Sequence, residues 1–324
     1  MAAITLGTAF PFSSESPASM LTTAGAILPI FLLIVVGYAF KRTGFLGDGF
    51  WAPAEKLVYY VLLPALIIGS ITKSDLSSLP VGPMAFALLS MGSCMIVLSL
   101  LIKPLIGTDG PSFTSLLQGA TRINAYLCFA IGDALYGEIS IALCAYCLAI
   151  MMPFMNVTLV TLISAYAGTG KPNWRRVPLQ IIQNPIIIGC AIGWVVNTLA
   201  IPLPQWLVAS LSILERGTLP LALLCIGAGL ILVMDRRQMV AMSASVVLKL
   251  AIMPVIAIFT CQYFGVTGVP MAIVVLFAGA PASTSSYILA RQMGGNAPLM
   301  AAILSVQTVL AAVTLPPILA YVSP

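Results

Sequence analysis

The sequence predicts an all-α polytopic membrane protein with ten transmembrane helices, arranged as two inverted repeats of five. The first observation is composition: of 324 residues, 60% are hydrophobic and 7% are charged, whereas about a quarter of the residues in a soluble domain are charged. The second is a series of apolar runs of spanning length, which must be helices because lipid leaves unpaired backbone unsatisfied. The short alternating segments of a membrane barrel are missing from the sequence. The third is an internal repeat.

Charged residues or Gly and Pro clusters bound each of the ten expected spans. The spans cover residues 22–41, 54–73, 83–105, 112–136, 139–165, 178–200, 206–232, 239–263, 269–291 and 297–321. The residues before them, 1–21, form a polar leader without Lys or Arg, and therefore without the positive region of a signal peptide. This predicts a first repeat over 22–165, a cytoplasmic linker over 166–177 and a second repeat over 178–322.

Landmark residues of the first half recur in the second half at a constant distance. Each pair is separated by 156 residues, and the pairs are Pro29 with Pro185, Gly37 with Gly193, Tyr38 with Trp194, and Pro64 with Pro220. A repeat with an odd number of spans must enter the membrane from the opposite side in its second copy, so we expect the repeats to be inverted.

The loop cations predict the orientation of the chain. Alternate loops hold only Lys73 on one side and ten cations on the other: Lys41, Arg42, Lys56, Lys103, Lys171, Arg175, Arg176, Arg236, Arg237 and Arg291. Cytoplasmic loops carry the excess of Lys and Arg. Both termini are therefore expected outside, in a cell membrane.

The fourth and ninth spans carry polar clusters in their centres, and we expect both helices to be broken there. Pro281 removes a backbone donor and obstructs the carbonyl four residues earlier, while neighbouring hydroxyls offer other hydrogen-bond partners. Arg122 needs compensation at such a depth, because a charge there is costly. The alternative is that Pro, Ser and Thr merely shape and join helices. The candidate substrate residues are Gln118, Arg122, Asn124, Tyr126, Pro281, Ser283, Thr284, Ser285 and Ser286.

Three further charges lie within predicted spans, namely Glu215, Arg216 and Lys249. Glu215 and Arg216 point about 100° apart on a helix, so they are not expected to satisfy each other. Glu215 is expected to pair with Arg122 or Lys249. The alternatives are a proton-coupling carboxylate and a position at the outer end of the span.

Several function classes find no support in the sequence. It contains no His, the commonest general base and metal ligand. Paired Asp residues, a Ser-Lys dyad and an HExxH motif are also missing, so we expect no enzyme, cofactor or metal site. Cys144 and Cys147 form a CxxC spacing without further ligands. The cations are too scattered to bind nucleic acid.

Six segments, in order, carry a family resemblance: GYAFKRTGFL, YYVLLPALI, QGATRIN, NPIIIG, LPLALLCIGAGL and APASTSSYILARQMGG. Over nearly the whole chain the sequence resembles the auxin efflux carrier family of permeases, including its bacterial members. The resemblance implies that helices 4 and 9 cross at their broken centres, near the midplane and at Asn124 and Pro281. It also implies a scaffold of helices 1, 2, 6 and 7, a mobile bundle of the others, and a homodimer through the scaffold. In a crossover with Pro in both helices, each helix has a Pro at its break. This sequence departs from that pattern, because the fourth span has Asn124 at its break.

The expected function is that of a secondary transporter, a permease or efflux carrier working by alternating access. The resemblance implies small organic anions as substrates, such as auxin, malonate or malate. The other expected partner is the surrounding lipid bilayer. A sodium-coupled symporter of the bile acid type, with the same architecture, is the alternative.

Overall fold

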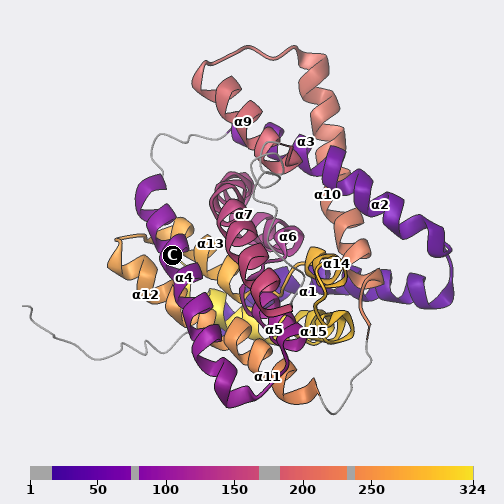
Figure 1. The fold of residues 1–324 in the computed structure, drawn as a ribbon. Helices are drawn as coiled ribbons and strands as arrows, with labels where there is room; N and C mark the ends of the chain where they lie inside the picture. The colour runs from indigo at the N-terminus through magenta and orange to yellow at the C-terminus, as the bar shows by residue number, and fades with distance from the viewer. Residues whose placement is uncertain (1–16, 74–79, 168–182, 232–237, 324) are drawn as a thin grey trace, which may run out of the picture.

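The structure is a computed structural model that describes residues 17–73, 80–167, 183–231 and 238–323 (Figure 1). All regular elements within these ranges are helical, and no strand is found there. Most of the expected leader and linker lies outside the described residues.

The first half of the chain contains α1 (Pro17–Thr43), η1 (Asp48–Phe50), α2 (Trp51–Leu57), η2 (Val58–Leu62), α3 (Leu63–Lys73), α4 (Val81–Ile106), α5 (Gly110–Thr121), α6 (Ala125–Tyr136) and α7 (Glu138–Ala167). The second half contains α9 (Pro185–Thr198), α10 (Gln205–Ala228), α11 (Met239–Val247), η4 (Leu248–Ile252), α12 (Met253–Tyr263), α13 (Gly268–Gly279), α14 (Ser285–Gln292) and α15 (Ala297–Val322).

The helices have the lengths and surfaces of a polytopic membrane protein. Large apolar side chains cover their outer faces: Leu105 is 85% exposed, Ile213 73% and Val313 72%. Such a surface is costly in water but suits lipid. Seven helical segments among the described residues are long and apolar enough to cross a bilayer: Met20–Thr43, Asp48–Lys73, Val81–Ile106, Glu138–Ala167, Gln205–Ala228, Met239–Tyr263 and Ala297–Val322. The predicted all-α polytopic membrane protein is confirmed at this level.

Short polar side chains fix where several helices begin. Asp109 accepts a hydrogen bond from the Ser112 backbone N–H at 2.9 Å, and Asn184 accepts one from the Ile186 N–H at 2.9 Å. Both helices also have a Pro in the first turn. Proline lacks an N–H, and an N–H at that position would have no acceptor within the helix. The capping residue and the Pro therefore define these helix starts from the sequence alone.

Two helices contain a π-helical turn just before a proline. The turn η2 precedes Pro64 and the turn η4 precedes Pro254. Proline has no N–H for the carbonyl four residues earlier, so the regular ladder is lost there. The backbone widens instead, and the N–H of Met253 bonds to the carbonyl of Leu248. Such single π turns are frequent at functional sites.

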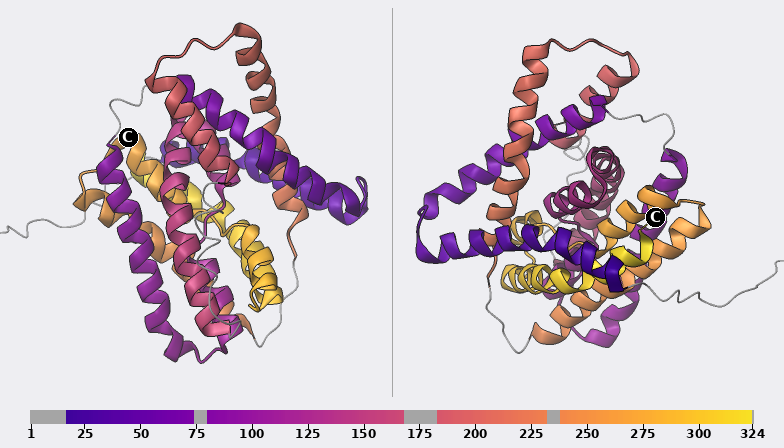
Figure 2. Two further views of the ribbon diagram at one scale, coloured as in Figure 1. Left: turned by 45° about the horizontal axis from the view of Figure 1, so that its top comes forward. Right: turned by 180° about the vertical axis from the view of Figure 1, so that it is seen from behind.

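The helices form two groups. Figures 1 and 2 show α2, α3, α9 and α10 together on one side of the molecule, and α1 packs along α10. The remaining helices form a bundle around the main hydrophobic core, which includes Phe129 and Phe277, both fully buried.

Glycines allow close approach within the first group. A Cβ at Gly37 on α1 would overlap the Leu224 carbonyl on α10, and a Cβ at Gly193 on α9 would lie 2.9 Å from the Ile71 Cβ and 3.5 Å from the Ile68 Cα on α3. Small residues at helix interfaces of membrane proteins permit such backbone contacts. The pairs α1 with α10 and α3 with α9 are therefore tightly packed.

Candidate functional site

The interrupted helices of the fourth and ninth segments meet each other. After α5 the backbone becomes extended at Arg122 (φ −73°, ψ 158°), and after α13 it becomes extended at Ala280 (φ −68°, ψ 143°). The Asn124 N–H donates to the Pro281 carbonyl oxygen at 2.8 Å. The interruptions expected from the sequence are thus observed, and they join through a backbone hydrogen bond. We call the residues 122–124 and 280–284 the junction.

Asn124 begins the second half of the fourth segment. Its Oδ1 accepts a hydrogen bond from the Leu127 N–H at 3.3 Å, which caps α6, and only 2% of the residue is exposed. Within the described part of the chain its Nδ2 group donates no hydrogen bond to a protein acceptor. The N-terminus of α6, and that of α14 at Ser285, carry the positive ends of their helix dipoles.

Arg122 links three helical segments at the junction. Its guanidinium donates to Ser285 Oγ at 3.1 Å and to Asn156 Oδ1, on α7, at 3.2 Å. Both partners are neutral, and no carboxylate forms a salt bridge with Arg122 among the described residues. The positive charge of Arg122 is therefore not neutralised by the protein there.

Buried polar atoms without a partner gather around the junction. They include both amide atoms of Gln118, the Nε of Arg122 and the Oγ of Ser286. Gln118 and Ser286 are fully buried. Buried polar groups in folded proteins are normally hydrogen-bonded, so a cluster of unpaired ones calls for water, an ion or a ligand.

Gln307 on α15 stabilises both interruptions, and sequence reasoning did not identify it. Its Oε1 accepts from the Ala282 N–H at 2.9 Å, and its Nε2 donates to the Gly119 carbonyl at 3.0 Å and the Ser245 carbonyl at 3.3 Å. The residue is fully buried. A Gln inside a long apolar helix is a signal that the sequence does contain, because polar side chains at this depth need partners.

The remaining predicted hydroxyls lie on the ninth segment. Ser283 Oγ and Ser285 Oγ are 3.0 Å apart, and Thr284 Oγ1 donates to Glu55 Oε1 on α2 at 3.1 Å. Glu55 is a second residue that sequence reasoning missed, because it lies at the end of an expected span next to Lys56. The contact joins α2 to the junction.

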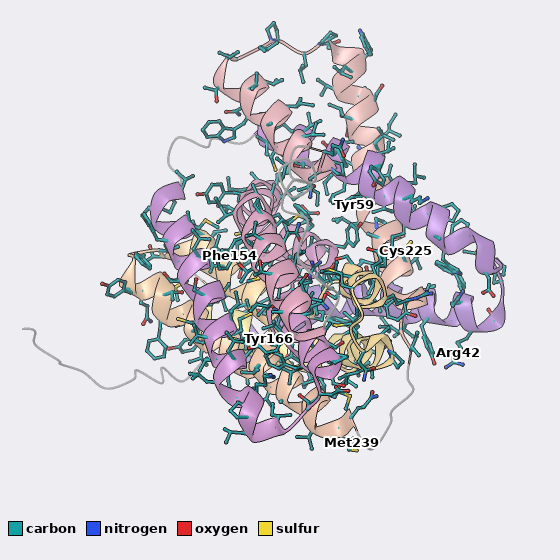
Figure 3. All side chains as sticks on the ribbon, viewed as in Figure 1. Arg42, Tyr59, Phe154, Tyr166, Cys225 and Met239 are labelled. Carbon is teal, nitrogen blue, oxygen red and sulfur yellow. The ribbon has the colours of Figure 1, made fainter. Side chains whose placement is uncertain are left out.

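Tyr126 faces the other group of helices. It packs against Val58, Leu62 and Ala222, which come from η2 and α10. Tyr59 and Cys225, labelled in Figure 3, come from the same two elements and lie close enough to Tyr126 to interact electrostatically. Tyr126 therefore lies at the contact between the two helix groups.

The comparison with protein families gives one match. Residues 173–319, a little under half of the chain, match the family model described as a membrane transport protein. This part of the chain is similar to that family. The match includes the second half of the junction and confirms the resemblance to the auxin efflux carrier family. No curated protein matches the sequence.

The charges of this transporter pair differently from the expectation. Glu215 Oε2 lies 3.4 Å from Lys73 Nζ, so its partner is neither Arg122 nor Lys249. Both belong to the first helix group, where α3 packs on α10. Arg216 is exposed rather than buried, because neighbouring side chains on a helix point in different directions. Lys249 is fully buried and forms no salt bridge with a described residue.

The transporter has a cavity of about 430 Å³ beside the Lys73–Glu215 pair, lined by residues of α3, α9 and α10 and the loop between α9 and α10. None of the junction residues lines it. Glu215 Oε1, beside this cavity, is one of seven buried side-chain atoms without a partner among the described residues, but four of the seven belong to Gln118, Arg122 and Ser286 at or next to the junction, so the junction remains the candidate substrate site.

Proposed function

We propose that this protein is a secondary transporter that carries small organic carboxylate anions across the membrane by alternating access, with the junction as its substrate site. The observation that supports this most strongly is the group of hydrogen-bond donors at the junction beside a guanidinium that forms no salt bridge with a described carboxylate. Arg122 has only neutral partners, and the N-termini of α6 and α14 lie beside it. In proteins generally, carboxylates are commonly bound by helix N-termini and by guanidinium groups.

Four residues in or next to the junction have a role in this proposal. Arg122 supplies the charge, the Asn124 Nδ2 group donates to one carboxylate oxygen, and the unpaired amide of Gln118 binds a second polar group of the substrate. Ser286 adds a buried hydroxyl. The buried groups that lack a protein partner are then satisfied by the substrate, which avoids the cost of leaving them unpaired.

The proposal includes ten spans in two inverted repeats, with the junction near the midplane. Contacts between equivalent positions support it. Thr218 Oγ1 donates to the Leu62 carbonyl at 3.0 Å, and these two residues are separated by the repeat distance of 156. The contact of Gly37 with Leu224 has its counterpart in that of Gly193 with Ile68, shifted by the same distance. A residue that touches its own equivalent lies on the pseudo-two-fold axis that inverted repeats require.

The two helix groups support a mechanism of alternating access. We propose that α1, α2, α3, α9 and α10 form the scaffold, that the bundle moves against it, and that the scaffold forms a homodimer in the plasma membrane with both termini outside. The contacts of Tyr126 and Thr284 with the scaffold elements lie where such a movement would separate the groups.

Ligand binding by the purified protein tests this function. Melting temperatures are measured with a panel of small carboxylates, each paired with its uncharged amide. A ligand that binds the folded state raises the melting temperature, and the rise grows with the ratio of its concentration to Kd. We expect at least one carboxylate to raise the melting temperature and its amide to leave it unchanged. Equal effects of acid and amide, or no effect of any acid, would count against the assignment.

A further inference from the structure

Lys249 is the most deeply buried of the described cations that the proposed function does not use. The residue is fully buried in the π turn η4. Its Nζ lies 3.3 Å from the Phe277 carbonyl oxygen and 3.2 Å from Met253 Sδ. No described carboxylate pairs with it. An ammonium group in this setting is costly unless it meets a specific need of the structure.

The sequence explains why the Phe277 carbonyl needs a donor. In a continuous helix it would accept from the N–H of residue 281, four positions later. Residue 281 is Pro, which has no N–H. The preceding carbonyl, that of Leu276, keeps its helical partner, the N–H of Ala280. The Lys249 ammonium supplies the hydrogen bond that Pro281 removes.

The position is also the negative end of a broken helix. Phe277 lies in the last turn of α13, which ends at Gly279, so its carbonyl carries part of the negative end of the helix dipole. In transporters with interrupted helices, such C-terminal ends and unwound carbonyls bind the coupling cation. Lys249 thus contacts the last turn of α13.

We propose that the Lys249 ammonium is a built-in cation that takes the place of a dissociable coupling cation at the end of α13, so that substrate binding needs no sodium. The part of this inference that concerns substrate rests on the proposed function. The part that concerns the cation does not, since it can be measured without substrate.

The test compares melting temperatures in sodium chloride and in choline chloride at equal ionic strength. Wild-type protein is expected to melt at the same temperature in both salts. Lys249→Met keeps a side chain of similar length without the charge, and we expect it to melt several degrees lower in choline and to be partly restored by sodium. Lys56→Met, which removes an exposed cation, is the matched control and should show neither effect.

A double variant keeps the inference testable if Lys249→Met folds poorly. Pro281→Ala restores an N–H at residue 281, which reaches the Phe277 carbonyl if Ala280, extended in the wild type, becomes helical. Adding it to Lys249→Met should then recover part of the lost stability. Lys249→Arg should remain independent of sodium. Sodium-specific stabilisation of the wild type, or strictly additive effects of the Lys249 and Pro281 changes, would overturn the inference.

The two proposals fail separately. If no carboxylate binds while the salt comparison gives the expected pattern, the substrate assignment is wrong and the built-in cation stands. If carboxylates bind the wild type only in sodium, the substrate assignment stands and the built-in cation is wrong.

Discussion

The substitution Gln307→Leu tests how the two helix interruptions are held together. Leu has a similar volume and a comparable helix propensity, so the change removes mainly the side-chain hydrogen bonds. Ala282 loses the acceptor of its N–H and Gly119 loses the donor to its carbonyl. The Gly119 carbonyl has lost its usual helical partner because α5 ends at Thr121. Both groups are then left buried and unpaired.

The expected magnitude follows from those two groups. Each unsatisfied buried group costs about 1–3 kcal/mol, so the loss is roughly 2–6 kcal/mol in the free energy of unfolding. We expect a melting temperature in detergent that is lower by several degrees, together with weaker carboxylate binding, because the junction is no longer fixed. Gln262→Leu on the exposed face of α12 is the control and should change neither quantity. A Gln307→Leu protein as stable as the wild type would refute this account of the junction.

Three further substitutions separate the roles of individual residues, and two cysteine variants test the topology. Asn124→Ala should abolish carboxylate binding, with a loss of about 1 kcal/mol of stability from the missing α6 cap; wild-type affinity would remove it from the site. Arg122→Lys should weaken carboxylate affinity by roughly ten- to a hundred-fold, about 1.4–2.8 kcal/mol, because Lys lacks the bidentate fork; unchanged affinity in a titration would exclude it as a ligand. Glu215→Gln should lower stability by no more than about 1 kcal/mol, because its Lys73 partner is partly exposed, and should leave affinity unchanged; a large loss of affinity would assign it to coupling. An impermeant thiol reagent should label Ile201→Cys from outside the cell and not Phe45→Cys, and the opposite result would reverse the topology.

The sequence predicted those features that depend on local chemistry. Apolar runs located the helices, although the sixth span was expected over 178–200 and α9 begins at Pro185, behind the Asn184 cap. The interruption at Pro281 was predictable because the missing N–H acts within one helical turn. These features need no knowledge of what packs against them.

Features that depend on distant contacts were not predicted. Glu215 was assigned to the wrong cations, because only the packing of α3 on α10 brings Lys73 within 3.4 Å of it. The roles of Gln307 and Glu55 depend on which backbone and hydroxyl groups of the ninth segment lie opposite them. Composition identifies such residues as polar groups in apolar surroundings, but it does not identify their partners.

The central claim is that the junction binds a carboxylate and carries it across the membrane. Its most direct test is uptake of a labelled carboxylate that binds the protein, measured in proteoliposomes alongside the corresponding amide. We predict saturable uptake of the acid by the wild type, no protein-dependent uptake of the amide, and no protein-dependent uptake of the acid by Asn124→Ala. Equal uptake of acid and amide, or undiminished uptake by Asn124→Ala, would contradict the claim.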